Sequence, residues 1–435
     1  MFIPHTKENE QEMLNKIGVS SIKELLSQIP QQFLYPALDL PAALTEAELT
    51  RHLHELAAKN KPLTNFIGAG MYEHFIPAAV GALASRGEFL TAYTPYQAEA
   101  SQGTLQTIYE FQSCVCALTG MDVATASHYD GATALMEAAL ACYRVTGRKE
   151  IVLSAAIHPH YKEVLKTYTR HLGITLTEIS LSADGTLDTE VLEKQLSENT
   201  ACVVFATPNF YGILEHGEKI SALAHAKGAL TVVHVNPISL GILKAPADYG
   251  ADFVTAEGQP LGNPMSFGGP ALGIIATKKA YMRQLPGRIV GIAKDHDGKR
   301  AFVLTLQARE QHIRREKASS NICSNEAQCA LNAVIYLTLL GPQGLKEVSL
   351  LNLERAHQLA SAICGVKGYA LKYTAPFFNE FVVTCPVAAQ TVIDKMAEKG
   401  IAAGYEVGEK ELLVCATELR TAADISTYVK ALEVL

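Results

Sequence analysis

Residues 252–270 read Asp-Phe-Val-Thr-Ala-Glu-Gly-Gln-Pro-Leu-Gly-Asn-Pro-Met-Ser-Phe-Gly-Gly-Pro, which is the pattern of a strand, a turn and a glycine loop. A pyridoxal-phosphate enzyme carries the lysine that forms an imine with its cofactor in such a layout. This stretch contains no lysine. No other side chain replaces that amine. We therefore expect this chain to assist imine chemistry without supplying the lysine on which that chemistry depends.

A second block combines tyrosines with turn-forming residues. The motif Tyr-Thr-Pro-Tyr-Gln at 93–97 joins two aromatic hydroxyls through a stiff Thr-Pro step. It predicts a fixed loop that presents Tyr93, Thr94 and Tyr96 to a site. Aromatic packing at a subunit interface explains the same composition, and both roles are compatible.

Residues 127–139 predict a glycine turn that opens a helix. Free amides at such a helix start bind phosphate, which makes Gly131 and Thr133 candidates for cofactor binding. The spacing favours the alternative of a capped helix start, in which Asp130 or Thr133 satisfies these amides. The triplet His-Pro-His at 158–160 lacks a third ligand nearby, so we interpret it as a polar turn and predict no metal site.

The most polar block of the chain is 309–323. On a continuous helix, Glu310 would pair with Arg314 four residues later, which is typical of a solvated, ion-paired face. The block ends in a turn of small residues, so it could equally line a cleft between two domains. Its candidates for contacts with a carboxylate or with a partner subunit are Arg314, Arg315 and Asn321.

The elements that must position these residues follow from the apolar pattern. Between residues 66 and 277, short β-branched runs alternate with helix-length stretches. This alternation predicts a largely parallel sheet with helices on both faces, and ligands collect at the carboxyl ends of such strands. The expected strands are 151–154, 174–179, 202–206, 231–235, 253–255 and 273–276.

We predict three parts along the chain. Residues 1–60 form a helical arm, in which Ser21 and Glu24 have the spacing of a capping box and Thr45 caps a second amphipathic stretch at 44–58. Residues 61–310 form the large domain. Residues 311–435 form a connector helix and a small α+β domain. The expected strands of this small domain are 380–384 and 411–416, and its expected helices are 389–399 and 422–435. A helix-rich stretch is expected over 280–340.

The charge and the cysteine content of the chain argue against several classes of protein function. The chain has 435 residues, of which 48% are hydrophobic, and 37 basic against 44 acidic side chains give a net charge of −7. Without a basic run, nucleic acid and anionic membranes are not expected partners. Nine scattered cysteines are typical of free thiols in a reducing compartment. The first residues match neither a signal nor a transit peptide, so we predict a cytoplasmic protein.

Five sequence blocks occur in a characteristic order. They are Tyr-Thr-Pro-Tyr-Gln at 93–97 with Ser-Gln-Gly at 101–103, Asp-Gly-Ala-Thr-Ala at 130–134, Gly-Gln-Pro-Leu-Gly at 258–262 with Ser-Phe-Gly-Gly-Pro at 266–270, Pro-Gly-Arg-Ile-Val-Gly at 286–291, and Arg-Glu-Gln-His-Ile-Arg-Arg-Glu-Lys-Ala at 309–318 with Ser-Asn-Ile-Cys at 320–323. Together they closely resemble the P-protein family of the glycine cleavage system, over almost the whole chain.

The resemblance implies a fold. Family members have the fold-type I architecture of pyridoxal-phosphate enzymes, with a large domain like that of aspartate aminotransferase, built on a mainly parallel sheet, and a smaller carboxy-terminal α+β domain. The family occurs as one long chain or as two half-length chains. The length and the missing lysine of this chain resemble the first half, subunit 1 or α.

The resemblance also implies which residues are missing. In subunit 2, the cofactor lysine lies in a His-Lys-Thr strand end before a glycine loop, and counting back from Pro270 places Gln259 at that point here. The strand 231–237 offers no carboxylate for the pyridine nitrogen. We therefore expect pyridoxal phosphate to be bound covalently by subunit 2 and not by this chain.

The implied activity is that of glycine dehydrogenase (aminomethyl-transferring). The complex would decarboxylate glycine and pass the aminomethyl group to the lipoyl arm of H protein, with the T and L proteins completing the system. This chain would be inactive alone and supply one wall of the site in a heterodimer. Tyr93, Thr94 and Tyr96 are the first candidates for that wall.

Two alternatives remain open at this point. The chain could be a self-sufficient pyridoxal-phosphate enzyme with a displaced lysine, such as Lys244, Lys278 or Lys279. It could also be a non-catalytic scaffold, whose cleft serves only as a docking surface for the partner or for H protein.

Overall fold

The computed structural model of the chain describes residues 5–90, 92–323 and 325–435. Contacts between residues divide it into two units, with the boundary between Lys61 and Pro62.

The first unit consists of short helices with almost no core. Its elements are α1 (Lys7–Ile17), α2 (Ile22–Leu25), the 3-10 turn η1 (Gln31–Phe33) and α3 (Glu46–Ala57). Thr45 caps α3 as predicted, since its hydroxyl accepts the Glu48 N–H. The capping box predicted at Ser21 is wrong, because Ser21 makes no side-chain cap and Glu24 accepts from the backbone of Ser20 instead. Among residues 5–61, Leu14 alone is buried.

The second unit is built on a seven-stranded sheet. Its strands, in spatial order, are β2 (Val123–Ala124), β8 (Gly273–Thr277), β7 (Phe253–Glu257), β6 (Leu230–Val235), β5 (Thr200–Ala206), β3 (Glu150–Ser154) and β4 (Thr175–Ile179). The strands from β7 to β4 are mutually parallel, while β8 and β2 run antiparallel to their neighbours. All six predicted strands and the largely parallel sheet are confirmed.

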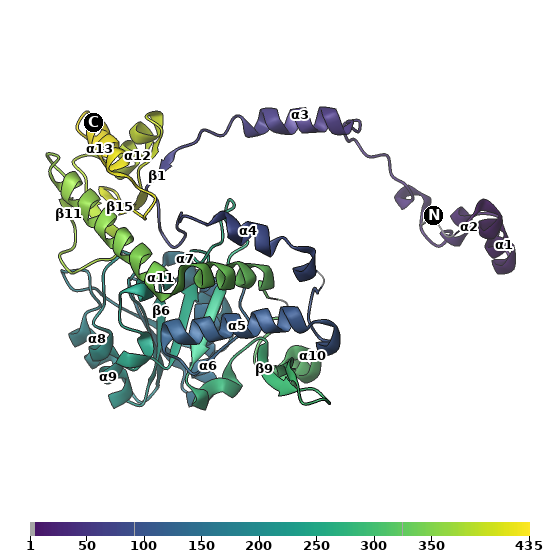
Figure 1. The fold of residues 1–435 in the computed structure, drawn as a ribbon, viewed down its shortest axis with the longest axis horizontal. Coiled ribbons are helices and arrows are strands. Elements are labelled where there is room, and N and C mark those ends of the chain that lie inside the picture. The colour runs from purple at the N-terminus through teal and green to yellow at the C-terminus, as the bar shows by residue number, and fades with distance from the viewer. Residues whose placement is uncertain (1–4, 91, 324) are drawn as a thin grey trace. The chain divides into compact units, whose positions relative to one another are not determined.

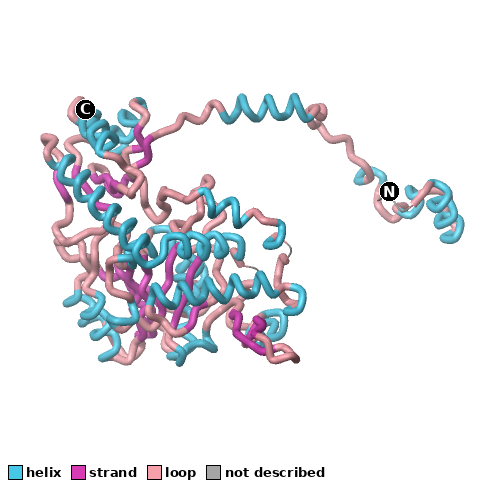
Figure 2. The backbone as a smooth tube through the Cα atoms, viewed as in Figure 1, coloured by secondary structure: helices cyan, strands magenta, loops and turns pink. Residues whose placement is uncertain are grey.

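Helices cover both faces of this sheet (Figures 1 and 2). On one face, Val203 and Val233 pack with residues of α5 (Gln102–Thr119) and α9 (Gly217–Ala226). On the other face, Val204 and Val232 pack with α6 (Gly131–Thr146) and α7 (Pro159–Thr169). Because successive strand residues point to opposite faces, two apolar layers require continuous apolar strands. The remaining helices of this part are α4 (Ala78–Ala84) and α8 (Thr189–Gln195).

The helix-rich stretch predicted for 280–340 is partly wrong. A hairpin of β9 (Ile289–Lys294) and β10 (Arg300–Thr305) occupies its first half. Buried and exposed residues alternate along β10, and Phe302 packs against Leu105 and Ile108 of α5. A strand that is half-buried in this way has period-two patterning, which a helix cannot satisfy.

One long helix joins the two cores of the second unit. In α11 (Ala327–Cys364), Gly341 has φ 61° and interrupts the helical backbone just before Pro342. Residues before this break, including Ala330, pack in the core under the large sheet. Residues after it, including Ala356, pack in a separate core. The helix passes from one core to the other after the break, since Leu345 still packs in the core under the large sheet.

The second core lies under a small antiparallel sheet. Its strands, in spatial order, are β11 (Ala370–Leu371), β12 (Glu380–Thr384), β15 (Glu411–Cys415) and β14 (Tyr405–Gly408), and its helices are α12 (Ala389–Glu398) and α13 (Ala422–Leu432). The short strand β1 (Thr64–Asn65) pairs with β13 (Ile401–Ala402). These elements match the α+β order expected for the carboxy-terminal part. The domain boundaries near residues 60 and 310 stay predictions.

Short 3-10 turns connect many of these elements. They are η2 (Gly87–Phe89), η3 (Ala98–Ala100), η4 (Pro237–Gly241), η5 (Pro246–Tyr249), η6 (Lys279–Gln284), η7 (Gln307–Arg309) and η8 (Arg315–Lys317), with the one-turn helix α10 (Gln311–Arg314). Within the described residues, no helix is long and apolar enough to cross a membrane.

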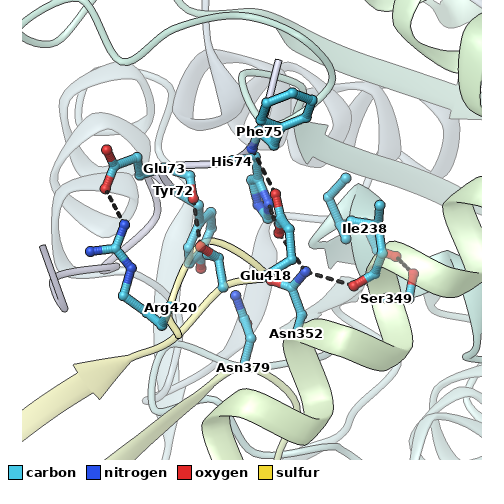
Figure 3. A network of polar contacts seen from close by, with 12 residues as sticks. Tyr72, Glu73, His74, Phe75, Ile238, Ser349, Asn352, Asn379, Glu418 and Arg420 are labelled. Carbon is cyan, nitrogen blue, oxygen red and sulfur yellow. Dashed lines mark hydrogen bonds and ion pairs between the residues drawn. The ribbon is translucent and has the colours of Figure 1, made fainter. Parts of the chain in front are cut away.

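A buried polar network ties the loop after β15 to the rest of the second unit (Figure 3). Glu418 accepts the Phe75 N–H at 2.7 Å and the Asn352 side-chain amide at 2.8 Å. Its other contact is His74 Nδ1, also at 2.8 Å. Although burial opposes it, His74 and these donors hold the pKa of Glu418 below its usual 4.5. One carboxylate thus connects α11, residues 74–75 and the small sheet.

Replacing Glu418 with Ala should lower the free energy of unfolding of the chain by about 1–3 kcal/mol at neutral pH, because the buried side chains of His74 and Asn352 and the N–H of Phe75 lose their partner. Because the folded-state pKa of Glu418 lies below 4.5, its ionised carboxylate stabilises the protein above pH 4.5. This contribution is lost as the pH falls through the folded-state pKa. Urea unfolding of both proteins between neutral and acid pH measures the effect, with exposed Glu347→Gln as the control. A difference that does not shrink below pH 4.5 would contradict this account.

Candidate functional site

The carboxyl ends of β5, β6 and β7 meet at one edge of the sheet and enclose a small cavity. Its volume is about 50 Å³. Pockets that hold small ligands usually measure roughly 300–1,000 Å³, so this cavity has room for water alone. The polar side chains that line it are Tyr72, His158, Tyr161, Asn209, His234, Asn236, Glu257 and Glu380.

Aromatic rings fill one side of the cavity. The ring of His158, at the start of α7, stacks on Tyr161 at 4.8 Å, and Tyr161 meets the ring of His234 edge-on at 5.1 Å. His158 Nε2 lies 2.9 Å from the carbonyl oxygen of Ala69. Burial and then the neighbouring His158 lower the pKa of His234 to about 3, and burial raises the pKa of Tyr161. His234 is therefore neutral at physiological pH.

Two buried carboxyl groups face the same space. Glu380 accepts the Ala69 N–H at 2.6 Å and the Tyr72 hydroxyl at 2.7 Å, while burial raises its pKa to about 7. Glu257 accepts three backbone N–H groups, those of Gly131, Gln259 and Leu272, each at 2.9 Å. Burial raises the pKa of Glu257, and these three donors oppose the rise.

Gln259 is fully engaged in backbone hydrogen bonds. Its side-chain oxygen accepts the N–H of Tyr72 at 3.0 Å, and its amide nitrogen donates to the carbonyl oxygens of Tyr72 at 3.0 Å and Asn263 at 2.7 Å. The side chain is 2% exposed. Gln259 thus fastens the segment around Tyr72 to the turn after β7. It does not line the 50 Å³ cavity but an open cleft of about 600 Å³ next to it, which no lysine lines either.

The two candidates for phosphate binding are already occupied by carboxylates. The Thr133 N–H donates to Asp130 at 2.7 Å in a capping box, and the Gly131 N–H donates to Glu257. A capped helix start, the alternative favoured by the spacing, is therefore present. Within the described residues, no three His, Cys, Asp or Glu side chains are grouped to hold a metal, and His158 instead caps α7.

Three of the sequence blocks meet around Tyr96. The Tyr96 hydroxyl accepts a hydrogen bond from the Arg288 guanidinium at 3.1 Å, and that guanidinium also lies 5.4 Å from the centre of the Tyr96 ring. His312 meets the same ring edge-on at 5.6 Å. The Thr94 carbonyl accepts the Tyr96 N–H at 2.9 Å, which tightens the loop. Tyr93, in the same loop, is 89% exposed.

The block 309–323 is not the continuous helix that an ion-paired face would need. It breaks into α10 and η8, and Arg315 has a positive φ of 55° at the break. Arg309 donates to the carbonyls of Leu285 and Gly287, and the Ser320 hydroxyl donates to Glu137 of α6. These contacts hold both ends of the block against the large domain.

The six candidates for a cleft wall lie away from the cavity. Arg314, Arg315 and Asn321 are exposed, and Arg314 donates to the Ala308 carbonyl at 3.3 Å. The structure brings Tyr96 close to the block that contains them through His312. None of Tyr93, Thr94, Tyr96, Arg314, Arg315 and Asn321 lines the space between the strand ends.

Sequence reasoning missed four residues of the cavity. Glu257 had a signal, since a charged residue that ends an apolar strand of a parallel sheet lies at the ligand edge. Tyr161 lies one turn into α7, where nothing in its spacing marks it. Tyr72 and Glu380 are 308 positions apart in sequence, and only the fold brings them together.

Comparison with known proteins identifies the family. The model of the glycine cleavage system P-protein family matches residues 1–432. A relative from Moorella thermoacetica, named probable glycine dehydrogenase (decarboxylating) subunit 1, is 51% identical over 438 residues, with 99% of this chain and 98% of the relative covered. The chain belongs to the P-protein family of the glycine cleavage system.

Solved structures show the same relationship. A crystal structure of glycine decarboxylase (P-protein) in inhibitor-bound form superposes with a TM-score of 0.93 at 44% identity, covering 100% of this chain and 99% of that chain. A glutamate decarboxylase from Lactobacillus brevis superposes with a TM-score of 0.70 at 14% identity, covering 95% and 96% of the two chains. The fold is that of fold-type I pyridoxal-phosphate enzymes, as expected.

The residues at the strand ends of this P-protein family member do not fit pyridoxal phosphate. The cavity is too small for a phosphorylated ring, the amide of Gln259 is held by backbone, and the carboxylate of Glu257 fills the start of α6. No lysine lines the cavity. No catalytic step is therefore assigned to a cofactor bound in this chain.

Replacing Gln259 with Ala should lower the free energy of unfolding by about 1–3 kcal/mol, because both backbone groups of Tyr72 lose a buried partner. Urea unfolding of the purified chain measures this change. Gln343→Ala, at an exposed position of α11, is the matched control and should stay within about 0.5 kcal/mol of the parent. Equal stability of the two variants would show that the Gln259 amide does not hold this segment.

Proposed function

We propose that this chain is the lysine-less subunit of a two-chain glycine decarboxylase. Its full-length match to proteins named subunit 1 supports a second subunit as its partner. In this proposal, the partner binds pyridoxal phosphate covalently, and the two chains form the heteromer that decarboxylates glycine in the cytoplasm.

The observation that carries this proposal is the environment of Gln259. At the position where the resemblance places the lysine, a neutral amide makes three hydrogen bonds to backbone groups. An amide has no nucleophilic nitrogen lone pair with which to attack an aldehyde. These bonds give Gln259 a structural role, which supports the proposal that this fold does without the lysine.

The proposed activity of the complex is that of glycine dehydrogenase (aminomethyl-transferring). When bound in subunit 2, pyridoxal phosphate supplies the electron sink that decarboxylation needs. The aminomethyl group then passes to the lipoyl arm of H protein, and the T and L proteins act downstream. This chain alone is inactive in the proposed scheme.

We assign this chain one wall of the active site in the complex. Arg288 is 3% exposed and anchors Tyr96 by a hydrogen bond and by its charge over the ring, so the loop has one fixed end. Tyr93 and Thr94 stand beside this anchor and extend the wall outward. The guanidinium groups of Arg314 and Arg315, with the amide of Asn321, offer an exposed donor surface for a carboxylate or for subunit 2.

The first unit supports assembly with another chain. In α3, Leu49, Leu53 and Leu56 follow one face of the helix and are 46%, 53% and 42% exposed. A helix of this kind needs an apolar surface to bury its stripe. We propose that residues 1–61 bind subunit 2 in the assembled enzyme.

The positions of the alternative lysines do not favour a self-sufficient enzyme. Lys278 follows β8, whose last residue Thr277 pairs with Phe253 at the start of β7, so it lies at the opposite edge from Glu257. Its ammonium group contacts Asp252 at 2.6 Å. Lys279 is the next residue and is exposed, and Lys244 pairs with Glu218 on the surface.

Incubating the isolated chain with pyridoxal phosphate and borohydride should leave all of its lysines unmodified by the cofactor. The same treatment of the chain mixed with subunit 2 should label one lysine of subunit 2 and none of this chain. Peptide mass spectrometry reads out both reactions, and exchange of carbon dioxide with glycine measures activity. Stoichiometric labelling of the isolated chain, or exchange without a partner, would refute the proposal.

Replacing Tyr96 with Phe should lower turnover of the assembled complex about 10–100-fold, since it removes the partner of a buried guanidinium from the proposed wall. Assembly, measured by the mass of the complex, should be unchanged. Tyr168→Phe, on the exposed side of α7, is the control and should keep full activity. If variants of 93–97 change affinity for subunit 2 and never the rate, the chain is a scaffold instead.

A further inference from the structure

A carboxylate of the chain itself occupies the start of α6. Glu257 ends β7 at the carboxyl edge of the parallel strands, and Gly131 is the first residue of α6. The Gly131 N–H donates to Glu257 Oε2, while the N–H groups of Gln259 and Leu272 donate to Oε1. Backbone amides of a helix start bind anions, so the side chain lies where an external anion would bind.

Glycine at 131 permits this close approach. A Cβ atom at this position would lie 3.0 Å from the Cβ of Glu257 and 2.5 Å from the hydroxyl oxygen of Tyr161. Both distances are shorter than a methyl group tolerates. The helix start is therefore in contact with the carboxylate on one side and with a tyrosine on the other.

The surrounding side chains close the remaining space. Glu257 is 6% exposed, and the adjoining cavity of about 50 Å³ is bounded by the stacked rings of His158 and Tyr161. This cavity is too small for a phosphate ester, and the larger open cleft of about 600 Å³ beside Gln259 is lined by neither Glu257 nor Gly131. The start of α6 is thus complete without a ligand.

We propose that Glu257 is a built-in anion that replaces phosphate at the α6 N-terminus, so that this subunit carries a filled cleft and not an empty cofactor site. The inference concerns residues of this chain alone and does not depend on the identity of its partner. It explains why Gly131 and Thr133 retain the sequence of a phosphate-binding turn without serving as one.

Removing the side chain should open the anion position. The wild-type chain and Glu257→Ala are titrated with inorganic phosphate at constant ionic strength, and ³¹P NMR and thermal unfolding are recorded. Glu257→Ala should bind phosphate at least about tenfold more tightly than the wild type and gain about 1–2 °C in Tm at saturating phosphate. The wild type should show neither effect.

Glu257→Gln is the matched control. Its side chain still fills the space, but an N–H donor must then face an N–H group, since one carboxylate oxygen becomes an amide nitrogen. This variant should gain no phosphate affinity, while deuterium exchange should accelerate at the amides that face the new nitrogen, either that of Gly131 or those of Gln259 and Leu272. Asp188→Ala, which removes the cap of α8 at a half-buried position, controls for general effects of phosphate on helix starts.

Two results would overturn the proposal. One is phosphate binding by the wild type as tight as that by Glu257→Ala, and the other is exchange in Glu257→Gln that is unchanged at the three amides. The second readout needs only the Gln variant, so it remains decisive if the Ala variant does not fold. Cofactor trapping on subunit 2 is a separate measurement, and its failure would leave this result standing.

Discussion

The bonds between the Glu257 carboxylate and three backbone amides hold together the parts that would otherwise form a ligand cleft. They connect the start of α6, the turn after β7 and the first residue before β8. Each connected segment comes from a different place in the chain, and each leaves a buried N–H group that needs an acceptor. The arrangement of the cleft as a closed structure follows from this one requirement.

Gln259 and Glu418 apply the same principle on the neighbouring segment. The Gln259 side-chain amide binds the N–H and the carbonyl oxygen of Tyr72. Glu418 accepts the N–H of Phe75, three residues further along the chain. Residues 72–75 are therefore fixed at two points by side chains from the loops that follow β7 and β15. This hydrogen-bonded arrangement is compatible with our proposal that the chain contributes to catalysis through its outer surface, at Tyr96 and the block that follows Arg309.

The sequence predicted the sheet well because its strands are buried on both faces. Runs such as β5 consist of apolar and β-branched residues, and their spacing with helices leaves few alternative topologies. The hairpin of β9 and β10 was missed because only one of its faces is buried, and residues of a charged turn interrupt its pattern. The missed capping box at Ser21 shows the limit of spacing rules, since Ser20 competes for the same glutamate.

The candidate site was less predictable, for a physical reason. Motifs located the strand end at Gln259 and the helix start at Gly131, yet no role was predicted for the Glu257 carboxylate that joins them. Whether a polar residue faces solvent, a ligand or its own backbone depends on contacts between distant segments, such as that of Tyr72 with Glu380. Local patterns carry no information about such contacts.

Glu257 and Gln259 stand two positions apart, and each is bonded to the closed cleft in its own way. A lysine introduced at position 259 would meet a helix start that is still filled, and loss of Glu257 would leave three backbone N–H groups without their acceptor. A change toward cofactor binding at this edge therefore needs at least two substitutions, and folding stability opposes the one that empties the helix start.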